Sequence, residues 1–139
     1  MSAARWEHFE HEADIGVRGT GDTLASAFEQ AALAMSAIIT DLSLIKPRDE
    51  VTITCEDADQ ELLLADWLNA LIFKMSTHKM LFSQFEVYIH NGHLKATARG
   101  EPINIKRHQP AVEIKGATYT ELVVHKSQEL WIAQCVIDV

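Results

Sequence analysis

Two aspartates and the carboxyl end of the chain could together hold a metal ion. Asp14 lies between two short extended segments, and Asp138 directly precedes Val139. Asp138 and the terminal carboxylate place two anions within one residue, and a cation would relieve their repulsion. If the fold brings Asp14 to that end, three oxygen-bearing groups converge, and such hard ligands suit calcium, magnesium or manganese rather than zinc. The alternatives are a turn aspartate that bonds its own backbone and a solvated chain end.

The sequence lacks the motifs of an enzyme that works alone. Gly16, Gly19 and Gly21 have the spacing of neither a phosphate-binding loop nor a dinucleotide fingerprint, and no serine occupies a nucleophile elbow. His8 and His11 are three residues apart, a spacing that could bind zinc on a helix. The segment has the pattern of a strand, in which such side chains point to opposite faces, so we expect no zinc site there.

A second pair of histidines, His90 and His93, flanks the dipeptide Asn91-Gly92. This dipeptide is a strong signal for a two-residue type I′ turn between antiparallel strands, because both turn positions need a positive φ. We therefore expect the two histidines to face each other as an exposed cross-strand pair.

Four further residues have plain structural explanations when they are considered one at a time. Cys55 and Cys135 lie in apolar stretches, and two cysteines are too few for a disulfide framework, so we expect reduced core thiols. Lys115 stands at the start of a predicted strand, where a lysine is usually solvated. Asp41 follows an apolar helix and could be a helix-end or turn residue.

The spacing of apolar residues indicates the elements that must position these side chains. Helical spacing predicts helices over residues 24–38 and 62–75, the first of them capped by Asp22 or Thr23. Residues 101–112 are polar and contain two prolines, which predicts an irregular segment. Strands are predicted over residues 6–11, 15–19, 51–56, 80–89, 94–100, 117–125 and 130–137.

This order of elements favours an α+β fold. Strands, a helix, a strand, a helix and then four strands predict a mixed sheet with two helices packed on one face, in a single domain over residues 1–139. Residues 131–137 are apolar on both faces, which is typical of a central, buried strand.

Composition excludes several classes of function. The chain is 47% hydrophobic and 23% charged, which is typical of a globular protein and not of a disordered one. Its formal net charge of −8 disfavours direct binding to a nucleic-acid backbone. No apolar run has the length of a signal-peptide core or of a bilayer span, so we expect a soluble, cytoplasmic protein.

Motifs spread over nearly the whole chain resemble the archease family. Their order and spacing make the match specific, although two positions depart from the family pattern: Glu12 replaces the usual threonine, and Thr120 replaces a frequent histidine. Glu12 adds negative charge near the proposed site. The segments that carry the resemblance are His11–Gly16, Ala27–Ala32, Thr40–Asp41, Glu61–Leu63, Trp67–Asn69, Ala98–Glu101, Lys115–Tyr119 and Ile137–Val139.

The resemblance implies a protein cofactor rather than an enzyme. Archease-like proteins assist an RtcB-type RNA ligase in tRNA splicing and RNA repair, and they promote guanylylation of its active-site histidine and hence multiple turnover. The resemblance implies a divalent metal, calcium first, with Asp14, Asp138 and Val139 as ligands. It also implies further functional positions at Lys115 and Asp41, and a strand-helix-strand-strand module inserted into a compact α/β domain.

Two function classes other than ligase activation stay open from the residues themselves. A small hydrolase or isomerase could use Asp14 and a histidine as acid and base, and it would turn over a small molecule without a partner. A general chaperone or protein-interaction module would instead suppress the aggregation of unrelated clients.

Overall fold

The first and last strands of the chain form one antiparallel sheet. The computed structural model describes residues 3–139. The sheet has the order β1-β2-β8-β6, and β7 pairs with β8 as well. The strand β8 is therefore central, as the apolar pattern of residues 131–137 predicts. The bounds are Arg5–His11 for β1, Asp14–Gly21 for β2, Gly116–Ala117 for β6, Val123–Ser127 for β7 and Leu130–Asp138 for β8.

A second antiparallel sheet has the order β3-β5-β4. Its strands are β3 (Asp49–Glu56), β4 (Met80–His90) and β5 (His93–Pro102). The predicted hairpin joins β4 to β5: Asn91 and Gly92 have φ values of 49° and 77°, which a type I′ turn requires at both positions.

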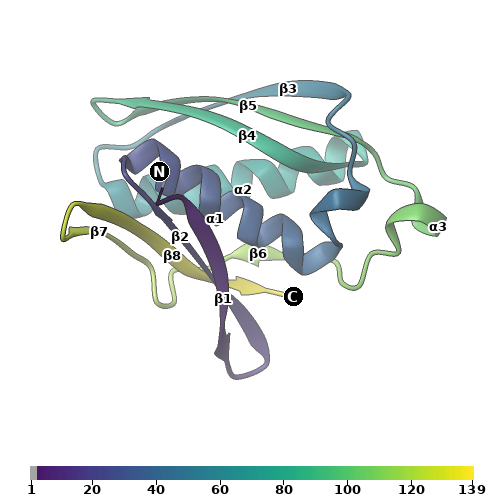
Figure 1. Cartoon of the computed structure of the whole chain (residues 1–139), viewed down its shortest axis with the longest axis horizontal. Coiled ribbons are helices and arrows are strands. Elements are labelled where there is room, and N and C mark those ends of the chain that lie inside the picture. Colours follow the sequence, from purple (N-terminus) through teal and green to yellow (C-terminus); the bar gives the residue numbers. More distant parts are fainter. Residues whose placement is uncertain (1–2) are drawn as a thin grey trace.

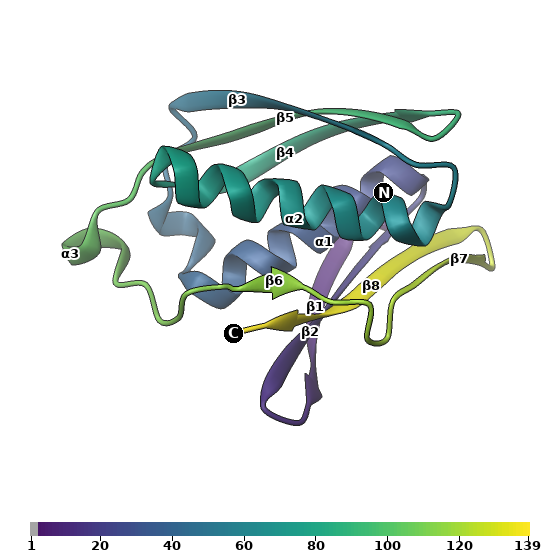
Figure 2. The same ribbon diagram turned by 180° about the vertical axis from the view of Figure 1, so that it is seen from behind.

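Two long helices, α1 (Leu24–Ile39) and α2 (Gln60–His78), lie between the two sheets (Figure 1; Figure 2). The side chain of Thr23 accepts a hydrogen bond from the Ser26 N–H and caps α1, and that of Asp59 caps α2. The helix α1 packs against both β2 and β4, so it is apolar around most of its circumference. Neither helix is both long and apolar enough to cross a bilayer.

The helix α1 approaches the first sheet so closely that β2 needs a glycine there. A Cβ atom at Gly19 would overlap the carbonyl oxygen of Ala27 and the backbone nitrogen of Ala31. Between the helices, the Trp67 indole N–H donates to the carbonyl oxygen of Phe28 at 3.1 Å. These contacts fix the middle layer against the sheet that carries the chain end.

The α+β class and the inserted module are as predicted, whereas the single mixed sheet is not. The module β3-α2-β4-β5 stands between α1 and the last strands, and its three strands pair only with one another. All the strand pairs among residues 3–139 are antiparallel, and each sheet carries the two long helices on one face (Figure 1). Apolar alternation shows that a segment is a strand but does not show which strands pair, which explains the difference.

The segment 117–125 is two short strands rather than one. The Thr118 hydroxyl donates to the carbonyl oxygen of Val136 and accepts the Thr120 N–H, and Glu121 has a φ of 54°. This turn ends the regular strand at Ala117, although the Thr118 N–H and the Thr120 carbonyl oxygen still bond to the backbone of Val136 in β8. Two short helical segments, η1 (Leu42–Leu44) and α3 (Ile105–His108), were not expected from the sequence.

Candidate functional site

Asp14 lies beside the end of β8. The strands β2 and β8 pair with Ile15 opposite Ile137, so Asp14 comes next to Asp138 and Val139 in the antiparallel register. The backbone N–H of Val139 donates to the Asp14 carboxylate with an N···O distance of 3.4 Å. The fold therefore brings together the three groups whose convergence the sequence left conditional.

Lys115 reaches the same place through its backbone. Its N–H donates to the carbonyl oxygen of Asp138 at 2.8 Å, and Gly116 pairs with Asp138 in the sheet. The side chain of Lys115 itself is exposed. Three segments that are distant in sequence thus meet at one end of the first sheet, where they place a lysine next to two aspartates.

Asn69 of α2 holds the strand that carries Lys115, and sequence reasoning gave it no role of its own. Its side-chain Oδ1 accepts the Ala117 N–H at 2.9 Å, and its Nδ2 donates to the Ala117 carbonyl oxygen at 3.2 Å. The amide side chain thus makes the two hydrogen bonds that a neighbouring strand would make to the free edge of β6. The only feature of the sequence that pointed to Asn69 was its place in the segment Trp67–Asn69, which is part of the family resemblance.

Asp41 does not join this group. It caps η1, and its carboxylate accepts hydrogen bonds from the backbone N–H and the hydroxyl of Ser43 at 2.9 and 2.8 Å. The backbone bond, and then the hydroxyl bond, hold the pKa of Asp41 below its ordinary value. Among residues 3–139, no hydrogen bond or ion pair links this side chain to Asp14, Asp138 or Lys115.

The oxygen ligands at the end of β8 suffice for a hard cation only if the backbone or terminal carboxylate of Val139 supplies one of them. Asp14 and Asp138 are half-buried, and none of the ion pairs among the described residues includes either of them. Among residues 3–139, no three His, Cys, Asp or Glu side chains lie close enough together to hold a metal. Two carboxylates and an oxygen of Val139 would form an all-oxygen set, which suits calcium or magnesium.

A buried carboxylate in residues 101–112 is the main feature that the sequence did not predict. Only 1% of Glu101 is exposed, and its carboxylate accepts two hydrogen bonds from Arg107, at 2.7 and 2.8 Å, and one from the Lys46 N–H at 2.8 Å. The Arg107 hydrogen bonds hold the pKa of Glu101 well below its usual range, although burial opposes them. This cluster fixes the connection from β5 towards β6.

His108 completes the same cluster. Its Nδ1 accepts the Asn104 N–H at 2.8 Å, so the ring proton lies on Nε2. That Nε2 lies 3.0 Å from the Glu101 carboxylate and donates to it. Because one neutral tautomer satisfies both contacts, the cluster needs no charge on His108.

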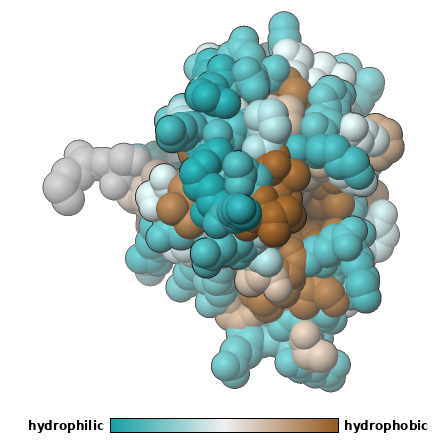
Figure 3. All heavy atoms as spheres, turned by 90° about the vertical axis from the view of Figure 1, so that its right-hand side faces the viewer, coloured by the Kyte–Doolittle hydropathy of each residue, from teal (hydrophilic) through white to brown (hydrophobic). Residues whose placement is uncertain are grey.

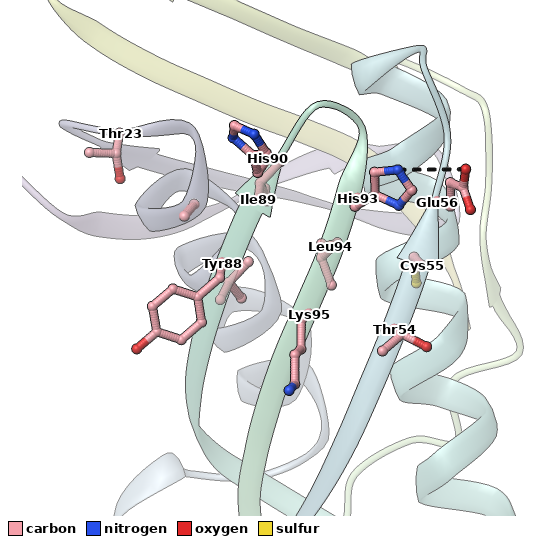
Figure 4. Close-up of a pocket in the computed structure, with 12 residues that line it drawn as sticks. Thr23, Thr54, Cys55, Glu56, Tyr88, Ile89, His90, His93, Leu94 and Lys95 are labelled. Atoms are coloured by element: carbon pink, nitrogen blue, oxygen red, sulfur yellow. Dashed lines mark ion pairs between the residues drawn. The ribbon is translucent and has the colours of Figure 1, made fainter.

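The predicted pair of histidines lies at the far end of the second sheet. His90 and His93 are opposite each other in the β4–β5 pairing and both are exposed, which confirms the prediction. They line a hollow of about 780 Å³ in which His93 points towards Glu56, with Nε2 3.8 Å from its carboxylate, while His90 points away (Figure 4). The imidazole rings of His90 and His93 therefore do not converge on a common point.

Both cysteines are free thiols, as predicted. Cys135 is fully buried in β8, and burial raises its pKa to about 12. Cys55 is half-buried, and burial raises its pKa as well. Neither thiol is therefore suited to act as a nucleophile at neutral pH.

Comparison with known proteins gives one consistent family. The family model described as "Archease protein family (MTH1598/TM1083)" matches residues 6–139. The chain is 39% identical to protein archease of Thermococcus gammatolerans over 139 residues, which cover 96% of this chain and 98% of the relative. It is 36% identical to protein archease of Pyrococcus abyssi, over 97% of this chain and 99% of the relative.

Two solved structures have the same fold. The solution structure of Methanobacterium thermoautotrophicum protein 1598 matches with a TM-score of 0.85 at 35% identity, covering 96% of this chain and 98% of the other. The crystal structure of a Thermotoga maritima archease, described as a possible chaperone, matches with a TM-score of 0.59 over 96% of each chain. At 21% identity, the second likeness concerns the fold alone.

Proposed function

The chain belongs to the archease family, and from this membership we propose that it activates an RtcB-type RNA ligase in tRNA splicing and RNA repair. It acts as a protein cofactor in the cytoplasm and not as an enzyme, by promoting guanylylation of the ligase and hence multiple turnover. The observation that carries the proposal is this membership, and the hydrogen bond from the Lys115 N–H to the Asp138 carbonyl oxygen supports it, because it keeps a lysine beside Asp14 and Asp138 at one end of the sheet.

The chemistry of this end suits a nucleotide-transfer reaction. Asp14, Asp138 and an oxygen of Val139 are the proposed ligands of a divalent metal, with calcium first and magnesium or manganese as alternatives. Such an ion supplies positive charge against phosphate oxygens. Lys115 adds a second positive charge that the fold holds nearby, and fixed charges of this kind stabilise phosphoryl transfer.

The net charge of the protein supports a ligase rather than RNA as its partner. A chain of net charge −8 is repelled by phosphate backbones but is attracted to a basic protein surface. A ligase that binds RNA presents such a surface. For Asp41, whose carboxylate is directed to Ser43, we propose an indirect contribution to activation through the turn that follows α1.

A multiple-turnover ligation assay with the cognate ligase tests the proposal. Asp14→Asn and Asp138→Asn keep the shape of each side chain and remove its charge, and we expect each to reduce the stimulation about tenfold or more. Asp22→Asn makes the same change at an exposed aspartate away from the site and should leave the stimulation unchanged. Full stimulation by both Asp14→Asn and Asp138→Asn would overturn the metal-bearing site.

A general chaperone is the second candidate, because several large apolar side chains are exposed. Phe73, Ile105 and Tyr119 are 64%, 67% and 68% exposed. Exposed apolar surface of this kind can bind unfolded clients. Suppression of the aggregation of unrelated proteins, with no effect on ligation, would favour this candidate over ligase activation.

A further inference from the structure

An apolar groove opens next to Lys115, at the end of the molecule where α2 ends. Its volume is about 730 Å³, within the usual range for binding sites in proteins. Figure 3 views the molecule from this end and shows apolar surface framed by hydrophilic side chains. Helix α2, the start of β4 and residues 103–115 supply the apolar lining: Ile72, Met75, Met80, Ile103, Val112 and Ile114.

One wall of the groove is a stretch of backbone whose hydrogen-bonding groups are unused. The residue before it, Ala111, donates to Ile39 at 2.8 Å, and the residue after it, Lys115, donates to Asp138 at 2.8 Å. Among the described residues, the N–H and C=O groups of residues 112–114 make no hydrogen bond. These residues lead on into β6 (Figure 2), so an added strand could pair with their N–H and C=O groups.

The rim of the groove is positively charged, although the whole protein is acidic. Lys79 and Lys115 both line the groove, and Glu113 is its one acidic residue. Lys79 ends α2 in the left-handed conformation with a φ of 54°, and its carbonyl oxygen accepts the Ile103 N–H at 2.8 Å. The backbone of Lys79 is therefore held in place, and a carboxylate of an occupant is favoured beside this lysine, whereas Lys115 lies next to Asp14 and Asp138.

We propose that an extended segment of the ligase binds in this groove, with apolar side chains in the hollow and at least one carboxylate at Lys79. Its backbone pairs with residues 112–114, as in other complexes in which a peptide adds a strand to a free edge. The unused edge favours a peptide over a small molecule. The inference rests on the proposed function and extends it, because a segment bound here would orient Lys115 and the two aspartates.

Titration of the ligase with the protein separates docking from activation. The double variant Lys79→Glu and Ile103→Asp should raise the concentration for half-maximal stimulation about tenfold or more and leave the maximum unchanged. The matched control is Ile105→Asp with Lys106→Glu on α3, two residues of the same types that do not line the groove. Asp14→Asn should do the reverse, with a lower maximum and an unchanged half-maximal concentration.

A second pair of variants tests the backbone pairing itself. Glu113→Pro removes an N–H that makes no hydrogen bond within the protein, whereas Glu113→Ala keeps it. We expect only the proline variant to raise the concentration of the protein at half-maximal stimulation. Equal melting temperatures of the two variants would show that the proline does not disturb folding. Hydrogen exchange of residues 111–115 should slow when the ligase is added to the wild-type protein.

The outcomes distinguish the two proposals. If the wild-type protein stimulates the ligase but the groove variants behave as their controls do, the groove proposal is wrong and the function stands. If the wild-type protein does not stimulate the ligase at all, the proposed function is wrong. If sedimentation shows a dimer that only the groove variants disrupt, a second copy of the chain occupies the groove and the proposal is overturned.

Discussion

Two clusters in this protein contain carboxylates with opposite surroundings. Glu101 is buried, and Arg107, His108 and the Lys46 backbone surround its carboxylate with donors. Asp14 and Asp138 are half-buried and lie side by side, and none of the ion pairs among residues 3–139 includes either of them.

This difference separates an acidic residue that stabilises the fold from acidic residues that are available to a ligand. A carboxylate whose acceptor positions are already filled gains little from an external cation. Two neighbouring carboxylates without a cation gain from one, since it removes their mutual repulsion. The number of donors around each carboxylate, and not its residue type or its burial, therefore indicates which carboxylates have acceptor positions left for a ligand.

The largest expected effect is on stability at Glu101. Glu101→Gln keeps the shape of the side chain but leaves Arg107 next to a neutral partner, and because 38% of the Arg107 side chain is exposed, water compensates for part of the lost charge pair. We expect the melting temperature to fall by about 6 °C or more in scanning calorimetry. Glu50→Gln, at an exposed carboxylate 3.2 Å from Arg99, is the matched control and should change it by less than about 2 °C. Equal effects of the two variants would contradict the contrast between the clusters.

The contribution of Glu101 should depend on pH in a direction that its pKa determines. The pKa of Glu101 in the folded protein is lowered, chiefly by the Arg107 hydrogen bonds, so the unfolded chain binds the proton more tightly. The stabilisation is then complete above about pH 4.5 and declines as the pH falls below that value. The difference in melting temperature between wild type and Glu101→Gln should be constant from about pH 6 to 8 and should shrink below about pH 4.5. A difference that grows on acidification would contradict the assignment.

Calcium should act on the other cluster alone. If Asp14 and Asp138 bind the ion, calcium at a hundredfold excess over its Kd should raise the melting temperature by about 5 °C or more. The double variant Asp14→Asn and Asp138→Asn should lose this rise, whereas Glu101→Gln should keep it from its lower starting value. Calorimetric titration gives the Kd directly. Loss of the calcium response in Glu101→Gln but not in the aspartate variant would reverse the roles of the clusters.

The sequence predicted local features better than long-range ones. A helix cap at Asp22 or Thr23, the Asn91-Gly92 turn and the central position of residues 131–137 all follow from local patterns, and the structure has all three, with Thr23 as the cap. The single mixed sheet was wrong because strand periodicity does not show which strands pair. The strand over residues 117–125 was wrong because Thr118 bonds to Val136 and to its own turn.

The same limit explains what was predicted of the two clusters. The meeting of Asp14 with the end of β8 could be stated as a condition, because both segments were recognisable as strands. The position of Lys115 beside them came from the family resemblance and not from its residue type. The cluster at Glu101 was missed because its partners include a backbone group 55 residues away, at Lys46, and a helix of four residues that no periodicity reveals.

The smallest expected effect concerns Asn69, which connects α2 to the strand that carries Lys115. Asn69→Ala removes both hydrogen bonds to Ala117, and because the side chain is exposed, water compensates for part of the loss. We expect the free energy of unfolding to fall by about 1 kcal/mol, measured by urea denaturation. Asn69→Asp keeps the acceptor for the Ala117 N–H and loses only the donor, so its effect should be smaller. Hydrogen exchange at Ala117 should quicken in the alanine variant, whereas exchange near Glu101 should not change. Faster exchange at both places would mean that the two clusters are coupled through α2 and that their roles cannot be separated.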